Sequence, residues 1–203
     1  MKTSFMGEGA LLVETADAAA AQDLRRALSA VSLPGLRQLV PGQASLLLEA
    51  DPLLTDLEAL AARLPELARA TPATPEARLH EFTVQYDGED LAACAKRLGI
   101  ETAELVRRHA APLYTVAFLG FAPGFPYLTG LDAGLKLPRR ADPRARVPAG
   151  SVAMADEFTG IYPEATPGGW HLLGRCDALL FDAARAVPAL LSPGDRVRFK
   201  PAP

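Results

Sequence analysis

The chain has 203 residues, of which 49% are hydrophobic and 22% are charged, which is typical of a folded globular protein and excludes extensive disorder. Its net charge of −3 argues against a nucleic-acid-binding protein that works through bulk positive charge, and no window approaches the ~20 apolar residues of a membrane span. Two cysteines are too few for a disulfide scaffold, and the three histidines have no metal-ligand spacing. We therefore expect a cytoplasmic protein that contacts neither nucleic acid nor membrane and binds no metal.

The N-terminal part of the chain predicts a small α/β unit. Asp17 is suited to cap the first helix, while Asp51-Pro52 opens the second and Pro65 ends or kinks it. The resulting order of strand, helix, strand, strand, helix, strand is that of the ferredoxin-like split β-α-β fold. The expected strands are 10–14, 36–40, 44–49 and 81–86, and the expected helices are 18–31 and 53–64.

The rest of the chain predicts a second unit rich in short strands. Two helices are expected first, at 90–98 and about 101–110, and Gly99 separates them. A buried strand follows at Leu113–Leu119. The remaining apolar segments are short and bounded by turn residues, which favours a small closed or half-closed β-barrel. These segments are 147–155, 169–173, 178–181 and 196–199. The second unit starts near Asp87-Gly88, and Thr71–Pro75 is a loop before the strand at 81–86.

A basic segment between residues 136 and 146 is the strongest candidate site. It contains five cations and a single acid, Asp142, in a chain that is acidic overall. Guanidinium groups suit the oxygens of carboxylates, phosphates or carbamates. The alternative is a solvated loop whose cations pair partly with acids elsewhere, and the sequence leaves both interpretations open. The cations are Lys136, Arg139, Arg140, Arg144 and Arg146.

The segment Gly120–Tyr127 places aromatic residues between residues that favour sharp turns. One interpretation is a packed loop that caps the barrel. The other is that Phe121, Phe125 and Tyr127 form the wall of a ligand pocket, and the two are compatible. His109 lies near a predicted helix end, where a capping role is more common than general-base catalysis.

Two further segments, Thr159–Tyr162 and Thr166–Trp170, bring hydroxyl groups close to free backbone amides. Gly168 and Gly169 permit close approach to a ligand, although they serve equally well as turn residues. Ser151 follows a glycine, but the hydrolase motif GxSxG is absent. Neither a nucleotide-binding glycine loop nor a zinc motif is present in the sequence.

Long motifs in this chain resemble the 5-oxoprolinase B-subunit family, also called the KipI or allophanate hydrolase subunit 1 family. These are FLGFAPGFPYLTGLD, PRRADPRARVPAGSVA, TGIYP and TPGGWHLLGR. MGEGALLVE, the junction HEFTVQYDGEDL and the closing PGDRVRF extend the resemblance over almost the whole chain. The resemblance implies an α+β fold, with an N-terminal ferredoxin-like α/β domain at 1–79 and a C-terminal cyclophilin-like β-barrel at 80–203.

The resemblance also implies a subunit of an ATP-dependent 5-oxoprolinase, which opens 5-oxoproline to glutamate. Such a chain is inactive alone and contributes half of a composite site. Its expected partners are a homologous barrel subunit of the 5-oxoprolinase C type and a lamB-like subunit of the A type, and ATP is expected to bind together with these partners. The alternatives are a KipI-like inhibitor of a sensor histidine kinase and half of a biotin-dependent urea-type carboxyltransferase.

The motif positions predict substrate-binding residues but no catalytic residue. One departure from the family pattern is the run Asp156-Glu157-Phe158, where the family usually has Gly-Gly-Gln, so substrate contacts are not carried over to this loop. The predicted substrate-binding residues are Arg140, Arg144, Arg146, Ser151, Thr159, Tyr162, Gly168 and Gly169.

Overall fold

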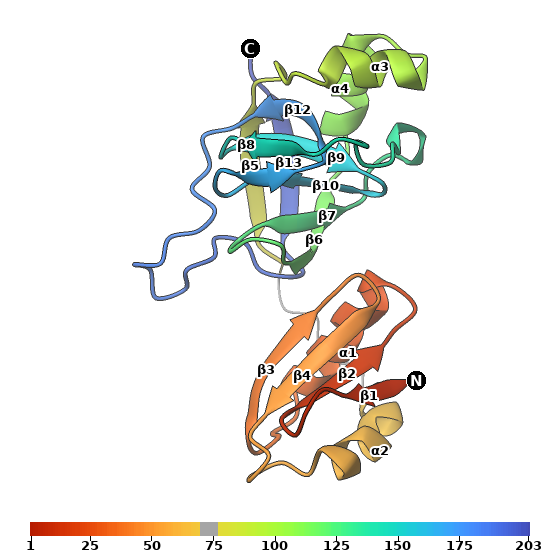
Figure 1. The fold of residues 1–203 in the computed structure, drawn as a ribbon, viewed down its shortest axis with the longest axis vertical. Helices are drawn as coiled ribbons and strands as arrows, with labels where there is room; N and C mark the ends of the chain where they lie inside the picture. The colour runs from red at the N-terminus through yellow and green to blue at the C-terminus, as the bar shows by residue number, and fades with distance from the viewer. Residues whose placement is uncertain (70–76) are drawn as a thin grey trace. The chain divides into compact units, whose positions relative to one another are not determined.

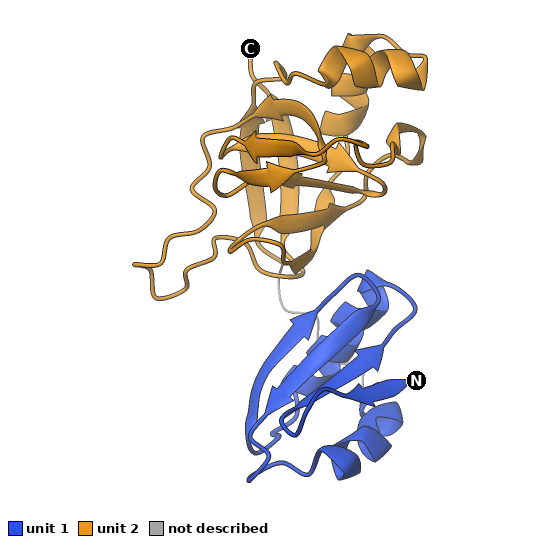
Figure 2. Ribbon diagram, viewed as in Figure 1, with its two compact units in different colours: residues 1–76 blue, residues 77–203 orange. Residues whose placement is uncertain are grey.

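The computed structural model describes residues 1–69 and 77–203, which form two compact units, 1–76 and 77–203 (Figure 2). The boundary expected from the sequence is 79/80. The predicted loop Thr71–Pro75 lies outside the described residues. Each unit has its own hydrophobic core. In the described part of the chain, no helix is long and apolar enough to cross a membrane.

Unit 1 is a four-stranded antiparallel sheet with two helices. The sheet order is β1-β2-β4-β3, and α1 packs against β3 and β4 (Figure 1). Alternation along β2 places Leu11 and Val13 in the core, where leucines of α1 and α2 cover them. The elements are β1 (Thr3–Phe5), β2 (Ala10–Glu14), α1 (Ala18–Ser29), β3 (Leu36–Pro41), β4 (Ser45–Ala50) and α2 (Leu57–Leu67).

The ferredoxin-like arrangement of unit 1 is not confirmed, because its fourth strand is not the one that the sequence indicates. The predicted split β-α-β core is present, since β2 and β3 are parallel on either side of the antiparallel β4. The edge beside β2, however, is occupied by β1, with Thr3 opposite Val13. The strand predicted at 81–86 belongs to the other unit as β5 (Leu79–Val84), where Val84 is fully buried in the second core. The strand pattern is local, whereas the choice of sheet depends on which core accepts the inward side chains.

The second helix of unit 1 also differs from its prediction. It begins at Leu57 and not near Leu53, which is 92% exposed, because the Asp56 carboxylate caps it by accepting the Ala59 N–H at 2.9 Å. Pro65 lies inside α2, which continues for two more residues. A proline near the end of a helix removes only one backbone donor, and the apolar stripe of α2 still packs on the sheet.

Unit 2 is a nearly closed barrel, as the sequence predicts. The sheet order is β12-β9-β10-β7-β6-β13-β5, with β11 and β8 forming a separate ribbon. The two ends of the sheet meet at Gln85 and Arg175, which exchange two backbone hydrogen bonds of 2.9 Å. The elements after β5 are α3 (Leu91–Leu98), α4 (Thr102–Ala110), β6 (Tyr114–Leu119), β7 (Pro126–Thr129), η1 (Ala133–Leu135), β8 (Arg144–Val147), β9 (Ser151–Ala155), β10 (Phe158–Ile161), β11 (Thr166–Gly168), β12 (His171–Arg175) and β13 (Arg196–Pro201).

Two of the predicted barrel strands differ in the structure from their predictions. The segment predicted at 147–155 is divided between β8 and β9, because Gly150 adopts a left-handed conformation with φ +78°. The segment predicted at 178–181 is not a strand, and only Phe181 forms an isolated bridge, to Ala189. Helices α3 and α4 lie together at one end of the barrel, where α3 contacts β12 and α4 contacts β13 (Figure 1).

Candidate functional site

The carboxylate of Asp90 organises the basic segment. Asp90 precedes α3 and is only 5% exposed. Its Oδ1 accepts from Arg140 Nη1 at 2.8 Å, and its two oxygens accept from Arg144 Nη1 and Nη2 at 2.9 Å. Its Oδ2 also accepts the Leu172 N–H at 2.8 Å. One acid therefore connects α3 to the basic segment and to β12. It also neutralises part of the positive charge of residues 136–146, whose acidic partners the sequence does not identify.

The electrostatics at Asp90 favour the ionised form. Burial alone would raise the pKa of this carboxyl, but the hydrogen bonds from Arg144 and Leu172, together with the charges of Arg144 and Arg140, outweigh it and hold the pKa below its usual value. Arg144 Nη2 also contacts Glu89 at 3.0 Å. Of the predicted substrate-binding arginines, Arg144 is thus the most fully committed to protein partners.

A cleft of about 450 Å³ opens between α3 and the segment 138–142. Arg97 and Arg139 line it, and neither forms an ion pair with any residue in the described part of the chain. Arg140 also lines it, with its backbone N–H bound to the Gly169 carbonyl at 2.8 Å. The cleft therefore combines Arg140, which Asp90 neutralises, with two arginines outside any ion pair and one further acid, Asp142, and this excess of guanidinium groups suits a small anion. Its lining includes Asp90, Cys94, Arg97, Arg139, Arg140 and His171.

His171 fixes one wall of this cleft. The residue is 4% exposed, and its Nε2 lies 2.9 Å from the Pro138 carbonyl.

Sequence reasoning missed Asp90, Arg97 and His171 as site residues. The acid could have been found, because five clustered cations require acidic partners and Glu89-Asp90 is an acidic pair at the start of a predicted helix. Arg97 carries no local signal, and His171 lies within the motif TPGGWHLLGR, whose predicted site residues are only its two glycines.

Arg146 lies outside the lining of this cleft. Its side chain is exposed on β8, and it forms no ion pair within residues 1–69 and 77–203. Lys136 is likewise exposed. The basic segment is therefore divided, with Arg140 and Arg144 held by Asp90 and the others directed to solvent or to the cleft.

The predicted glycine turn has a packing role that differs between its two residues. A Cβ on Gly168 would lie 2.3 Å from Tyr162 Oη, so this position admits only glycine while the tyrosine stays in place. A Cβ on Gly169 would meet Pro143 at an ordinary 3.7 Å. Tyr162 is 1% exposed, and burial raises the pKa of its hydroxyl. Gly168 therefore shapes the ribbon that carries Arg144, and substrate binding by the pair stays a prediction.

The aromatic segment packs against the barrel, as one interpretation of the sequence expects. Phe125 is 1% exposed and makes edge-to-face contacts with Tyr127, Tyr162 and Trp170 at ring distances of 5.0 to 5.3 Å. Phe121 is the exception, because it is 60% exposed and has φ +70°, a left-handed conformation that is costly for a bulky residue.

Thr159 lies in the core of the barrel. Its Oγ1 donates to the Ala153 carbonyl at 2.8 Å and lies 2.8 Å from Nε2 of His109, whose Nδ1 is 2.8 Å from the Tyr86 hydroxyl. Because the threonine proton is used, His109 donates through Nε2 and accepts from Tyr86. Thr159 is fully buried, which leaves no surface for substrate in this conformation. His109 is not a helix cap, and burial lowers its pKa to about 3, so the ring is neutral.

Ser151 and the run Asp156–Phe158, which departs from the family pattern, are both held by backbone hydrogen bonds of the barrel. Ser151 begins β9, is 5% exposed, and its carbonyl accepts the Tyr162 N–H at 2.9 Å. Asp156 and Glu157 form the two-residue turn between β9 and β10, with Asp156 at φ +51° and its N–H bound to the Leu137 carbonyl at 2.7 Å. The residues of the described ranges contain no group of His, Cys, Asp or Glu able to hold a metal ion.

Comparison with known proteins identifies relatives of the chain. Residues 1–191 match the family described as carboxyltransferase domain, subdomain C and D. The B subunit of 5-oxoprolinase from Escherichia coli O157:H7 is 52% identical over 130 residues, which are 63% of this chain and 60% of that protein. The aligned part of the chain thus spans less than two thirds of this curated relative.

Solved structures share the fold. The crystal structure of the protein TTHA0988 in space group P212121 superposes with a TM-score of 0.83 and 42% identity, covering 96% of this chain and 40% of that one. The urea carboxylase of Kluyveromyces lactis gives a TM-score of 0.72 at 19% identity, covering 99% of this chain and 22% of that one. At this low identity the second likeness concerns the fold only.

Proposed function

The chain belongs to the carboxyltransferase-domain family, subdomain C and D, and we propose that it is a subunit of an ATP-dependent 5-oxoprolinase complex. The observation that carries the proposal is the 52% identity to a protein named as the B subunit of 5-oxoprolinase. The cleft beside α3 supports it, because 5-oxoproline carries a carboxylate and its activation by ATP develops phosphate charge.

In the proposed reaction, ATP transfers its γ-phosphoryl group to the lactam oxygen and ADP is released, which makes the ring carbonyl carbon more electrophilic. One water adds to this carbon and the C–N bond breaks with the proton passing to nitrogen, and a second water displaces phosphate from the resulting acyl phosphate to give glutamate. Arg97 and Arg139 are the groups of this chain that we assign to the anionic substrate, since both line the cleft and neither forms an ion pair with a residue that the structure describes. Arg140 also lines the cleft and is paired with Asp90. Arg144 is a positioning residue, because its ion pairs with Asp90 and Glu89 hold the basic segment against α3.

We assign ATP, as a co-substrate, to a site completed by partner subunits. The sequence has no glycine-rich phosphate loop of its own, and the cleft offers the guanidinium groups of Arg97, from α3, and Arg139, from the segment 138–142. The expected partners are a homologous barrel protein and a lamB-like protein. The chain then contributes part of a composite site and is expected to be inactive alone.

The experiment is reconstitution. The purified chain, its partner proteins and their mixture are assayed for ATP hydrolysis that depends on 5-oxoproline, and only the mixture should turn over. Robust turnover by the chain alone would exclude the composite site. Turnover of a urea-type amide with bicarbonate and a biotin-carrying partner, in place of 5-oxoproline, would replace the proposal with the carboxyltransferase alternative.

Two variants connect the activity to the cleft. Arg139→Gln should lower kcat/KM of the complex by roughly ten- to a hundredfold, because a charge-assisted contact is lost. Arg185→Gln is the matched control, since Arg185 pairs with Asp182 on a different loop. Equal activity of the two variants would remove Arg139 from the site. The same assay on Arg146→Ala tests the predicted contact of that residue, which stays a prediction.

A further inference from the structure

The barrel is left with an open edge along β5. This strand is the last of the seven-stranded sheet, and only β13 pairs with it over its whole length. The carbonyls of Arg78 and Val84 accept the N–H groups of Arg196, in β13, and of Ala202, directly after it, at 2.8 Å, so the even-numbered residues of β5 face β13. The odd-numbered residues therefore direct their backbone groups to the other side, where Gln85 meets Arg175.

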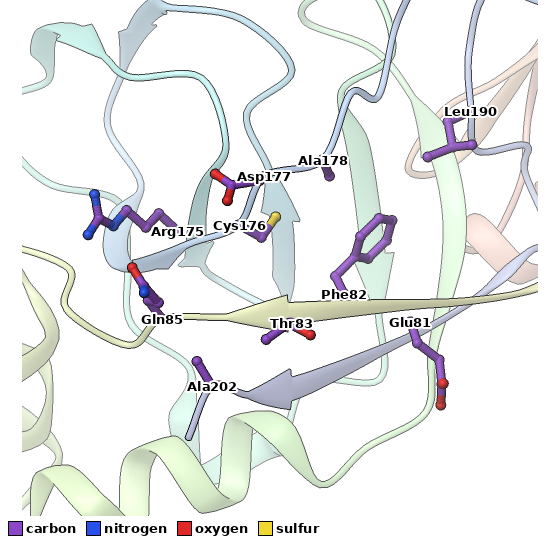
Figure 3. A pocket seen from close by; sticks show the side chains of 10 residues that line it. All are labelled: Glu81, Phe82, Thr83, Gln85, Arg175, Cys176, Asp177, Ala178, Leu190 and Ala202. Carbon is purple, nitrogen blue, oxygen red and sulfur yellow. The ribbon is translucent and has the colours of Figure 1, made fainter.

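Beyond that one bridge the pairing stops. Thr83 and Glu81 are the next residues whose N–H and C=O groups point away from β13, and no backbone partner for them exists in the described part of the chain. The opposite segment runs from Arg175 to Ala178 but turns away, because the Cys176 N–H bonds to the Gly150 carbonyl at 2.9 Å. Figure 3 shows this segment lying across from β5. The edge thus presents a short row of unused donors and acceptors.

A cleft of about 500 Å³ lies along this edge. Phe82, Ala178 and Leu190 give it an apolar part, and Figure 3 shows the Phe82 ring on the side of Ala178. A volume of this size accommodates several residues of an extended peptide. The cleft lining includes Glu81, Phe82, Thr83, Asp177, Ala178 and Leu190.

The charges at the cleft favour a basic occupant. Arg175 pairs with Asp87 at 3.1 Å, and Glu81 pairs with two cations of β13. Of the charged residues that line the cleft, Asp177 alone forms no ion pair with a residue that the structure describes. A Lys or Arg of an incoming segment would compensate this carboxylate.

We propose that the open edge of β5 is a docking site for an extended segment of a protein partner, which adds a strand beside Thr83 and Glu81 and presents a basic residue to Asp177 and an apolar residue to Phe82 and Leu190. Strand addition of this kind obtains affinity from backbone hydrogen bonds and specificity from alternate side chains. The proposal is independent of the 5-oxoprolinase activity.

The test uses the full chain and a probe peptide, an acetylated and amidated hexapeptide of alternating lysine and valine. Its binding is followed by the backbone amide NMR shifts of Thr83 and Glu81. Both amides should shift on titration, and a glutamate–valine analogue should bind about two- to fivefold more weakly, as expected for an exposed charge pair. A lysine–valine peptide that is N-methylated on alternate amides should not bind, since it cannot complete the ladder.

Protein variants test the same geometry. Thr83→Pro removes an outward N–H that the fold does not use and should abolish binding, whereas Thr83→Val keeps the donor and should bind normally. Asp177→Lys should reverse the preference for the basic peptide, and Glu164→Lys, an exposed acid elsewhere, should not. If Thr83→Pro fails to fold, the proposal is tested by the binding of the N-methylated peptide and by the peptide preference of Asp177→Lys.

Three results would overturn the proposal. One is the absence of amide shifts at millimolar peptide, and another is unchanged binding of the N-methylated peptide. The third is concentration-dependent dimerisation of the free chain that Thr83→Pro abolishes, which would assign the edge to a second copy of the chain.

Discussion

Replacing Asp90 with asparagine should destabilise unit 2 through its charge alone. The side chain of Asp90 is 7% exposed, and those of Arg144 and Arg140 are 17% and 32% exposed. Removing one member of a buried pair costs about 3–5 kcal/mol, but Arg140 is partly solvated and Arg144 retains Glu89, so we expect a loss of roughly 2–3 kcal/mol in the free energy of unfolding at pH 7. The amide oxygen of asparagine can still accept the Leu172 N–H, which limits the loss to the ion pairs.

The effect of Asp90→Asn should depend on pH in a defined direction. The folded-state pKa of Asp90 is below its ordinary value, because the hydrogen bonds and charges of the arginines outweigh its burial. Its stabilising contribution is therefore fully present above the unfolded pKa and is lost as the pH falls through the folded pKa. The difference between the natural protein and the variant should be constant from about pH 6 to pH 8 and should shrink below about pH 4.

The measurement is urea unfolding followed by tryptophan fluorescence. Trp170 is the only tryptophan of the chain and is 3% exposed in unit 2, so the signal reports the unit that contains Asp90. Asp142→Asn is the matched control, because Asp142 is an exposed acid of the basic segment whose side chain forms no ion pair within the described ranges. Unfolding free energies of the two variants within about 0.5 kcal/mol of each other at pH 7 would refute the central role of Asp90.

Other consequences of the structure can be checked on single variants. Thr159→Val removes the acceptor of a buried imidazole donor and should cost about 1–3 kcal/mol in urea unfolding, while a variant as stable as the natural protein would contradict the buried network. Gly168→Ala should lower the melting temperature because its methyl group meets Tyr162, with overpacking typically costing about 1–3 kcal/mol, whereas Gly169→Ala should change it little. The fragment 77–203 should keep a cooperative thermal transition because its core is its own, and a fragment without one would show that the core depends on unit 1.

Much of the local structure of this protein follows from the sequence alone. Asp17 is predicted to cap α1, and its Oδ1 accepts the Ala20 N–H at 2.8 Å. Gly99 is predicted to separate α3 from α4, and it adopts φ +67° at the end of α3. The long motifs likewise indicate the family from the sequence. The cap and the glycine depend on residues a few positions apart, where backbone preferences and capping hydrogen bonds act directly.

The tertiary structure decided the features that depend on distant pairing. Asp90 meets Arg140 and Arg144 across 50 and 54 residues, so although the cation cluster indicates that acidic partners are needed, only the fold decides which acid meets which arginine. Thr159 carries a motif signal, yet the register of β10 turns its hydroxyl toward His109 in the core. The sheet that β5 joins, the burial of Asp90 and the inward position of Thr159 all depend on sheet order and register. These are fixed by the whole fold, because burial of apolar surface from many distant segments determines which arrangement is stable.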